Sequence, residues 1–119
     1  MNVLRLVPGN LSVVVIVAAC VAAGAVREGF AAGDVKAGRQ KALMCQTCHG
    51  LDGQAKIAEA PNLAGQSELY LVKALKDYRS GARKNDMMSL VAPTLKDKEI
   101  DDLAAYYSAI EVTVSPPPK

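Results

Sequence analysis

Two of the chain's three cysteines and its single histidine stand within five consecutive positions, in the sequence CQTCH. Cys45 and Cys48 are separated by two residues, and His49 follows directly. Residues of these types serve three kinds of chemistry, namely a zinc site, a redox-active dithiol and the covalent attachment of haem. The surrounding sequence distinguishes between these alternatives.

A zinc site and a redox dithiol both fit poorly. Structural zinc takes four ligands, most often Cys and His. Only Cys45, Cys48 and His49 are available, and no second Cys or His pair follows them in the chain. A thioredoxin-like dithiol belongs to a βαβ unit, which the helical pattern described below lacks, and it leaves His49 without a role. Both interpretations are therefore disfavoured.

Covalent haem attachment gives all three residues a role. Cysteines three positions apart lie on one side of a helical turn, where their sulfurs can form thioethers to two vinyl groups on one porphyrin edge. His49 then presents its imidazole to the iron from one face. The spacing C-x-x-C-H is the signature of this attachment, so the sequence predicts one covalent haem c, bound by Cys45 and Cys48, with His49 as the proximal iron ligand.

The N-terminal part is typical of an export signal. Residues 11–26 are uncharged and apolar, Arg5 precedes them and Arg27 follows. Cleavage after the small residues 23–25 would release the protein, retention of residues 11–26 would tether it to the membrane, and lipoprotein processing would leave Cys20 lipidated. All three alternatives send the rest of the chain across a membrane. Because bacteria attach c-type haem outside the cytoplasm, we expect a periplasmic protein.

Length and charge set further limits. The chain of 119 residues has room for one domain, which we place at residues 32–112, after an export signal or anchor at 1–31 and before a disordered Pro-rich tail at 113–119. A net charge of +2 argues against a nucleic-acid partner, which requires a basic face. Residues 73–84 are mainly basic and 97–111 mainly acidic, and two interpretations stay open: an electric dipole that orients a charged partner, and solvated helix faces of opposite sign without such a role.

Helices must position the CQTCH segment. Apolar residues at helical spacing predict helices over 35–45, 68–80 and 97–110, and Asp34 and Ser67 are suited to cap the first two. The segments between the helices contain Gly and Pro and little periodicity, so loops are expected over 50–65 and 82–94. No alternation of strand period is present. The predicted class is all-α, and so small a domain without Trp needs a large apolar cofactor in its core.

With these elements in place, the chain resembles a class I cytochrome c, in particular the small bacterial monohaem type and one half of the dihaem bacterial cytochromes. The matching stretches are AGDVKAGRQKALMCQTCHG, APNLAGQ, YLVKALKDYRSGARKNDMM and LKDKEIDDLAAYYSAI. The resemblance implies three main helices and loops wrapped around one covalently bound haem. It also implies that the first and last helices cross, with Gly38 permitting close approach and Leu103 and Tyr106 packing there.

The resemblance also implies the surroundings of the iron. The carbonyl of Pro61 would accept a hydrogen bond from the His49 ring, which fixes the orientation of the ligand. The distal ligand would be a methionine, and the family spacing counted back from LKDKE places Met88 in this role. Two alternatives stay open, in which Met87 binds the iron or both methionines only pack.

One position departs from the family pattern. Lys96 stands where the family often has a serine that caps the last helix. Because a lysine side chain has no acceptor for the backbone amides, we expect Asp97 or Thr94 to provide the cap instead.

His and Met ligation would leave no open iron position for a substrate. The resemblance therefore implies an electron carrier rather than an enzyme, which passes single electrons between redox partner proteins, a donor and an acceptor, on the periplasmic side of the membrane. One alternative is a haem subunit fixed within a larger dehydrogenase or oxidase. Another is a ligand-binding sensor or enzyme in which Met88 is labile.

Overall fold

The computed structural model describes residues 33–118. The expected leader at 1–31, with its apolar segment 11–26 and Cys20, lies outside the described residues. Across the part of the chain that the structure describes, no helix has the length and apolar character needed to cross a membrane.

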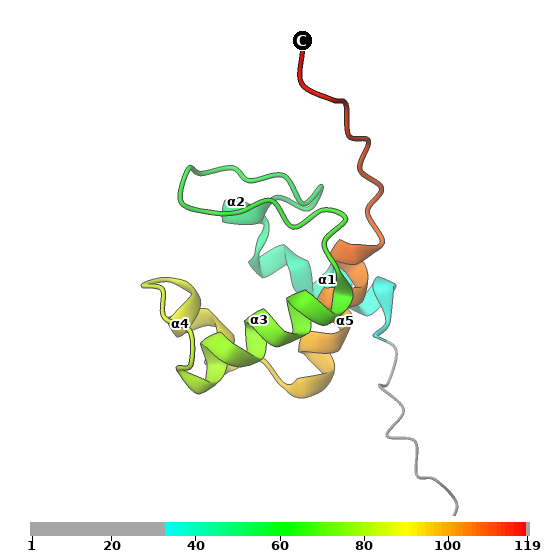
Figure 1. Ribbon diagram of the computed structural model, residues 1–119. Helices are drawn as coiled ribbons and strands as arrows, with labels where there is room; N and C mark the ends of the chain where they lie inside the picture. The colour runs from blue at the N-terminus through cyan, green and yellow to red at the C-terminus, as the bar shows by residue number, and fades with distance from the viewer. Residues whose placement is uncertain (1–32, 119) are drawn as a thin grey trace, which may run out of the picture.

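The described residues form helices connected by loops, and no strand is found among them. Three main helices are present, over residues 35–41, 68–80 and 97–108, and the last packs against both of the others (Figure 1). In chain order the elements are α1 (Val35–Lys41), the 3-10 helix η1 (Ala42–Met44), α2 (Gln46–His49), α3 (Glu68–Ser80), α4 (Met88–Val91), the 3-10 helix η2 (Ala92–Thr94) and α5 (Asp97–Ser108). The all-α expectation is confirmed.

The helix expected over residues 35–45 is interrupted. It begins as predicted, because the Asp34 carboxylate accepts hydrogen bonds from the second and third amides of α1 at 2.8 and 2.9 Å. It ends at Lys41, and the tighter 3-10 turn η1 follows, with the amide of Cys45 bonded to the carbonyl of Ala42 at 2.9 Å. The CQTCH segment therefore lies on a separate short helix, α2.

The second expected helix has the predicted bounds, but the loop after it was predicted incorrectly. Gly81 ends α3 in the left-handed region with φ of 79°, a conformation that glycine adopts without steric cost. Ser67 occupies the N-cap position of α3 without a capping bond from its side chain. Residues 82–94 contain α4 and η2 and are not a plain loop. The sequence did not predict these two helices, because helices of three or four residues are too short to show a periodic pattern.

The start of α5 uses a cap that the sequence did not indicate. The Glu99 carboxylate accepts a hydrogen bond from the amide of Lys96 at 2.9 Å, which is the backward half of a capping box. The Thr94 hydroxyl instead donates a hydrogen bond to the carbonyl of Val91, and Asp97 forms an ion pair with Arg79. Neither residue provides the expected cap.

The first and last helices cross at very close range. α1 packs mainly against α5, and a Cβ atom at Gly38 would lie 1.9 Å from the carbonyl oxygen of Asp102 and 2.8 Å from the Cβ of Tyr106. Gly33, just before α1, lies equally close to the backbone of Asp101. The crossing at Gly38 is confirmed, and Gly33 is a second contact of the same kind.

The hydrophobic core lies where α3 and α5 meet the segment that leads into α2. Arg79, near the end of α3, donates to the carbonyl of Leu95 at 3.2 Å and pairs with Asp97 at 2.5 Å, so the end of α3 is fixed to the start of α5. The buried core residues are Ala42, Leu71, Val72, Leu95, Ile100, Leu103, Ala104, Tyr106 and Tyr107.

Candidate functional site

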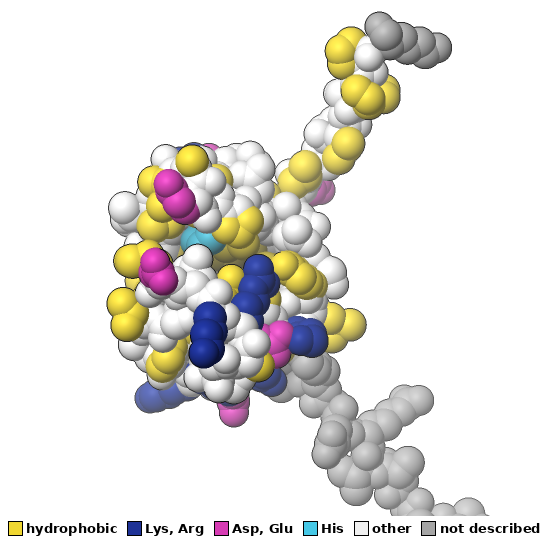
Figure 2. All heavy atoms as spheres, turned by 60° about the vertical axis from the view of Figure 1, so that its left-hand side comes forward, with side chains coloured by type: hydrophobic (Ala, Val, Ile, Leu, Met, Phe, Trp, Pro, Cys, Tyr) yellow, Lys and Arg dark blue, Asp and Glu magenta, His cyan; other side chains and the backbone are white. Residues whose placement is uncertain are grey.

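The two cysteines and the histidine of the CQTCH segment lie on one turn. The backbone amide of His49 bonds to the carbonyl of Cys45 at 2.9 Å, which closes one helical turn over the three residues. Cys45 and Cys48 are not joined in a disulfide, and each is partly buried. Figure 2 shows the chain's single histidine at the bottom of a hollow with hydrophobic side chains around it. The site therefore places two thiol side chains and one imidazole on a single turn, with the imidazole in an apolar recess.

The His49 ring is oriented by the loop that follows it. Its side chain is only 8% exposed, and its Nδ1 lies 2.9 Å from the carbonyl oxygen of Pro61. A carbonyl only accepts, so Nδ1 carries the proton and donates it, and Nε2 keeps its lone pair free for a metal. The hydrogen bond implied by the family resemblance is therefore present, with the geometry typical of a ligating histidine.

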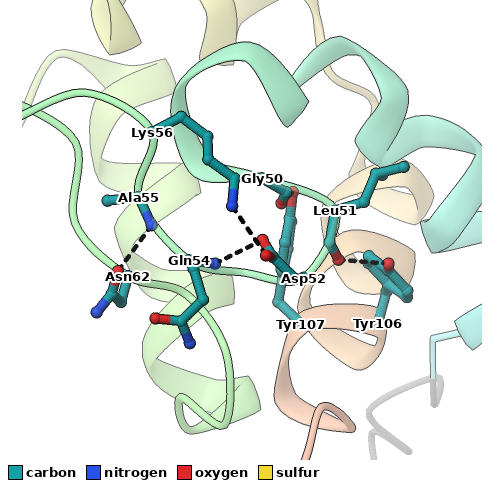
Figure 3. A network of polar contacts seen from close by, with 9 residues as sticks. All are labelled: Gly50, Leu51, Asp52, Gln54, Ala55, Lys56, Asn62, Tyr106 and Tyr107. Carbon is teal, nitrogen blue, oxygen red and sulfur yellow. Dashed lines mark hydrogen bonds and ion pairs between the residues drawn. The ribbon is translucent and has the colours of Figure 1, made fainter.

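Two tyrosines of α5 hold the backbone directly after His49. The Tyr107 hydroxyl donates a hydrogen bond to the carbonyl of Gly50 at 3.2 Å, and the Tyr106 hydroxyl donates one to the carbonyl of Leu51 at 2.6 Å. Both tyrosines reach this segment from α5 (Figure 3). Burial raises the pKa of Tyr107, so this hydroxyl stays neutral and able to donate. Sequence reasoning missed both bonds, because the partners are more than fifty positions apart.

The loop between Gly50 and Pro61 is folded back by its own polar contacts (Figure 3). The Lys56 ammonium donates a hydrogen bond to the Asp52 carboxylate at 2.8 Å, and this bond holds the pKa of Asp52 below its usual value. The amide of Lys56 also bonds to the carbonyl of Cys48 at 2.8 Å. The side chain of Asn62 accepts from the amide of Ala55 at 2.7 Å. These contacts return the chain to Pro61, beside the His49 ring.

The two methionines differ in their exposure. Met87 is 60% exposed, whereas Met88 is half-buried. Both lie at the start of α4, on the side of the molecule that also carries α2 in Figure 1. This side is turned forward in Figure 2, where the hollow with the histidine is seen.

The chemistry of these donors fits haem c. Two unpaired sulfurs three positions apart, an imidazole with one nitrogen free and a half-buried thioether are the groups that attach and ligate such a haem. Burial raises the pKa of the Cys45 thiol to about 11, against a smaller opposite effect of Lys41. Within residues 33–118, no group of three or more His, Cys, Asp and Glu side chains is arranged to hold a metal ion.

The family model described as cytochrome c matches residues 35–109. This match covers more than half of the sequence, and it includes the CQTCH segment, both methionines and all three main helices. The chain belongs to the cytochrome c family.

Individual proteins of known name agree with this assignment. The chain is similar to cytochrome c-554(548) of Halomonas halodenitrificans, with 47% identity over 83 residues that cover 67% of this chain and 100% of that protein. It is also similar to cytochrome c4 of Pseudomonas aeruginosa, with 40% identity over 71% of this chain and 42% of that protein. The crystal structure of reduced recombinant cytochrome c4 from Pseudomonas stutzeri superimposes with a TM-score of 0.64 and 38% identity, over 70% of this chain and 48% of that one.

These findings establish the class of protein. The chain has the class I cytochrome c fold, carries covalently attached haem c and functions in electron transfer. It spans the whole of the Halomonas relative but less than half of the c4 proteins that it matches.

Proposed function

We propose that Cys45 and Cys48 form the two thioethers and that His49 and Met88 are the axial iron ligands. The hydrogen bond between the buried His49 ring and the carbonyl of Pro61 carries this proposal, because it leaves Nε2 as the only ring nitrogen free to bind iron. The lower exposure of Met88 relative to Met87 supports Met88 as the distal ligand. Pro61 would then act on the iron through the ring that it orients.

We propose that the protein is a monohaem carrier of single electrons with no catalytic reaction of its own. The bound haem supplies an iron that accepts and releases one electron. The chain supplies a buried, fixed imidazole and an apolar recess, which limit the movement of ligands and the access of water. Two axial side chains would occupy both open iron positions, which removes the site that a substrate would need.

The cellular setting that we propose rests on the sequence of the chain and on its relatives. Residues 1–31 act as an export signal or anchor, residues 32–112 form the cytochrome domain in the periplasm, and 113–119 form a tail. Mass spectrometry of the protein purified from its host would show whether the leader is cleaved, retained or lipidated at Cys20. Retention together with copurification of a large complex would favour a fixed subunit over a diffusing carrier.

One relative indicates the kind of partner. A protein named thiosulfate dehydrogenase electron acceptor, from Stutzerimonas stutzeri, is 44% identical over 58% of this chain and 32% of its own length. We propose that a periplasmic dehydrogenase reduces the present protein and that a second redox protein oxidises it. Three of the four acids of α5 form ion pairs with basic residues of this chain, namely Arg79–Asp97, Lys41–Glu99 and Lys98–Asp102. Charge steering by the acidic segment is therefore weaker than the sequence alone implied.

The proposal is tested by absorption spectroscopy of the holoprotein and of two matched variants. We expect a low-spin ferric spectrum with the weak far-red band of a Met–iron bond, and a ferrous form that does not bind carbon monoxide quickly. Met88→Ala should remove the band and Met87→Ala should keep it. The opposite pattern would make Met87 the ligand. A high-spin protein that binds carbon monoxide at once would favour a sensor or an enzyme.

A further inference from the structure

Asn85 makes four hydrogen bonds around the turn that carries the two methionines. Its carboxamide oxygen accepts from the amide of Met87 at 3.1 Å and from that of Met88 at 3.0 Å. The backbone amide of Asn85 donates to the Ser89 hydroxyl at 3.0 Å, and its backbone carbonyl accepts from the backbone amide of Ser89 at 2.9 Å. In hydrogen-bonding terms Asn85 is the N-cap of the α4 turn, although the helix is assigned from Met88.

The surroundings of this turn explain why such a cap matters. α4 has only four residues, and a helix of this length is not stable through its own backbone bonds. None of its residues is fully buried, so core packing does little to fix it. Asn85 fixes the backbone of both methionines at once, and therefore acts whichever of them binds the iron.

We infer that Asn85 is a positioning residue for the distal methionine, which slows the release of the thioether from the iron. This inference rests on the proposed Met ligation and adds the residue that controls its kinetics. When the cap is removed, the Met87–Met88 backbone samples more conformations, and the sulfur leaves the iron more often. The iron then becomes accessible to small ligands without any change in the ligands themselves.

The chain contains a matched control for this role. Asp34 caps α1 by the same pattern, because its side chain accepts from the amides of Lys36 and Ala37 at 2.8 and 2.9 Å. Its carbonyl accepts from the amide of Gly38 at 2.8 Å, as that of Asn85 does from Ser89. Asp34→Ala therefore removes two equivalent side-chain bonds far along the chain from the methionines. Any general effect of losing a cap appears in both variants.

The measurement is the rate at which imidazole displaces the methionine from the ferric holoprotein, at saturating imidazole, where release of the sulfur limits the rate. We expect Asn85→Ala to raise this rate on the order of fivefold, the usual weight of an N-cap. Asn85→Asp keeps the acceptor and should restore the original rate. Asp34→Ala should lower the thermal unfolding temperature and leave the rate unchanged.

The outcomes distinguish a positioning role from a general loss of stability. An unchanged rate in Asn85→Ala, or an equal rise in Asp34→Ala, overturns the inference. Should Asn85→Ala yield no holoprotein, Ser89→Ala decides, because it removes the acceptor of the Asn85 amide and should raise the rate on the order of twofold. If neither Met87→Ala nor Met88→Ala removes the far-red band, the proposed ligation fails and the positioning role fails with it.

Discussion

Tyr107 on α5 donates a hydrogen bond of 3.2 Å to the carbonyl of Gly50, the residue that directly follows His49. Both residues are buried, and Tyr106 makes the equivalent contact with Leu51. The last helix of the domain thus holds the backbone of the segment that carries the proximal ligand.

Replacing Tyr107 with Phe tests this connection. We expect Tyr107→Phe to lower the free energy of unfolding by about 0.5–1.5 kcal/mol, because the buried Gly50 carbonyl loses one of its two donors and keeps only the backbone amide of Gly53. Denaturant titration of the holoprotein measures the change. Tyr78→Phe is the control, since it keeps the ring that stacks 4.7 Å from the Arg83 guanidinium. Equal effects of the two substitutions would show that the Gly50 contact contributes nothing specific.

Two glycines of different surroundings test the helix crossing. Gly38→Ala should prevent formation of a stable holoprotein or cost several kcal/mol, because its Cβ would overlap the backbone of Asp102. Gly81→Ala should cost only about 1 kcal/mol, because its Cβ meets nothing within 4 Å and only the positive φ is unfavourable. The yield and thermal unfolding of both variants measure this. A fully stable Gly38→Ala protein would contradict the close crossing.

Asp102 links the stability of the fold to pH. It is 5% exposed; burial raises its pKa, and the bonds from Lys98 and from the amide of Asp34 together outweigh this effect and lower the pKa below the ordinary value. A carboxylate whose pKa is lower in the folded state stabilises above its unfolded pKa, and this contribution is lost as the pH falls through the folded value.

We therefore expect Asp102→Asn to be less stable than the wild type at pH 7 by about 1–3 kcal/mol, since Asn can still accept from the Asp34 amide but cannot pair with Lys98. The difference should shrink below about pH 4. Denaturant titrations across the acid range measure it. Glu59→Gln, at an exposed position, should show no such dependence. A difference that stayed constant with pH would refute the role of the charge.

Single and double cysteine variants test the covalent attachment. Cys45→Ser and Cys48→Ser should each retain haem on a denaturing gel through the remaining thioether, and the double variant should lose it. Each single variant should also show its ferrous α band at longer wavelength, because one vinyl group stays conjugated with the ring. Covalent haem in the double variant would place the attachment elsewhere in the chain.

The sequence predicted the long elements and not the short ones. The bounds of the 13-residue α3 agree with the predicted ones. The spacing of its apolar residues indicates the buried face of the helix, and Gly81 follows its last residue. The helix over 35–45 was overextended, since nothing in the local pattern marks the 3-10 turn at Ala42. α4 was missed, although Asn85 before an apolar run is a known N-cap signal that could have revealed it.

In the site, the features that depend on adjacent residues could be predicted from the sequence, and those that depend on contacts distant in sequence could not. Cys45, Cys48 and His49 are adjacent in sequence, so their grouping could be read directly from it. Pro61 came only through the family resemblance, because no local signal shows which carbonyl meets the ring. The bonds from Tyr106 and Tyr107 depend on how α5 docks, and a single sequence does not contain that information.

The crossing of α1 and α5 also governs how the chain folds. The contact between Asp34 and Asp102 joins positions 68 residues apart, so nearly the whole domain must be synthesised before the crossing can close. Closing so long a loop costs conformational entropy, and only the contacts that form once α1 and α5 meet offset this cost. A chain that stops before α5 would leave the CQTCH segment without the Tyr106 and Tyr107 contacts and without the core residues of α5, so the finished pocket would not form.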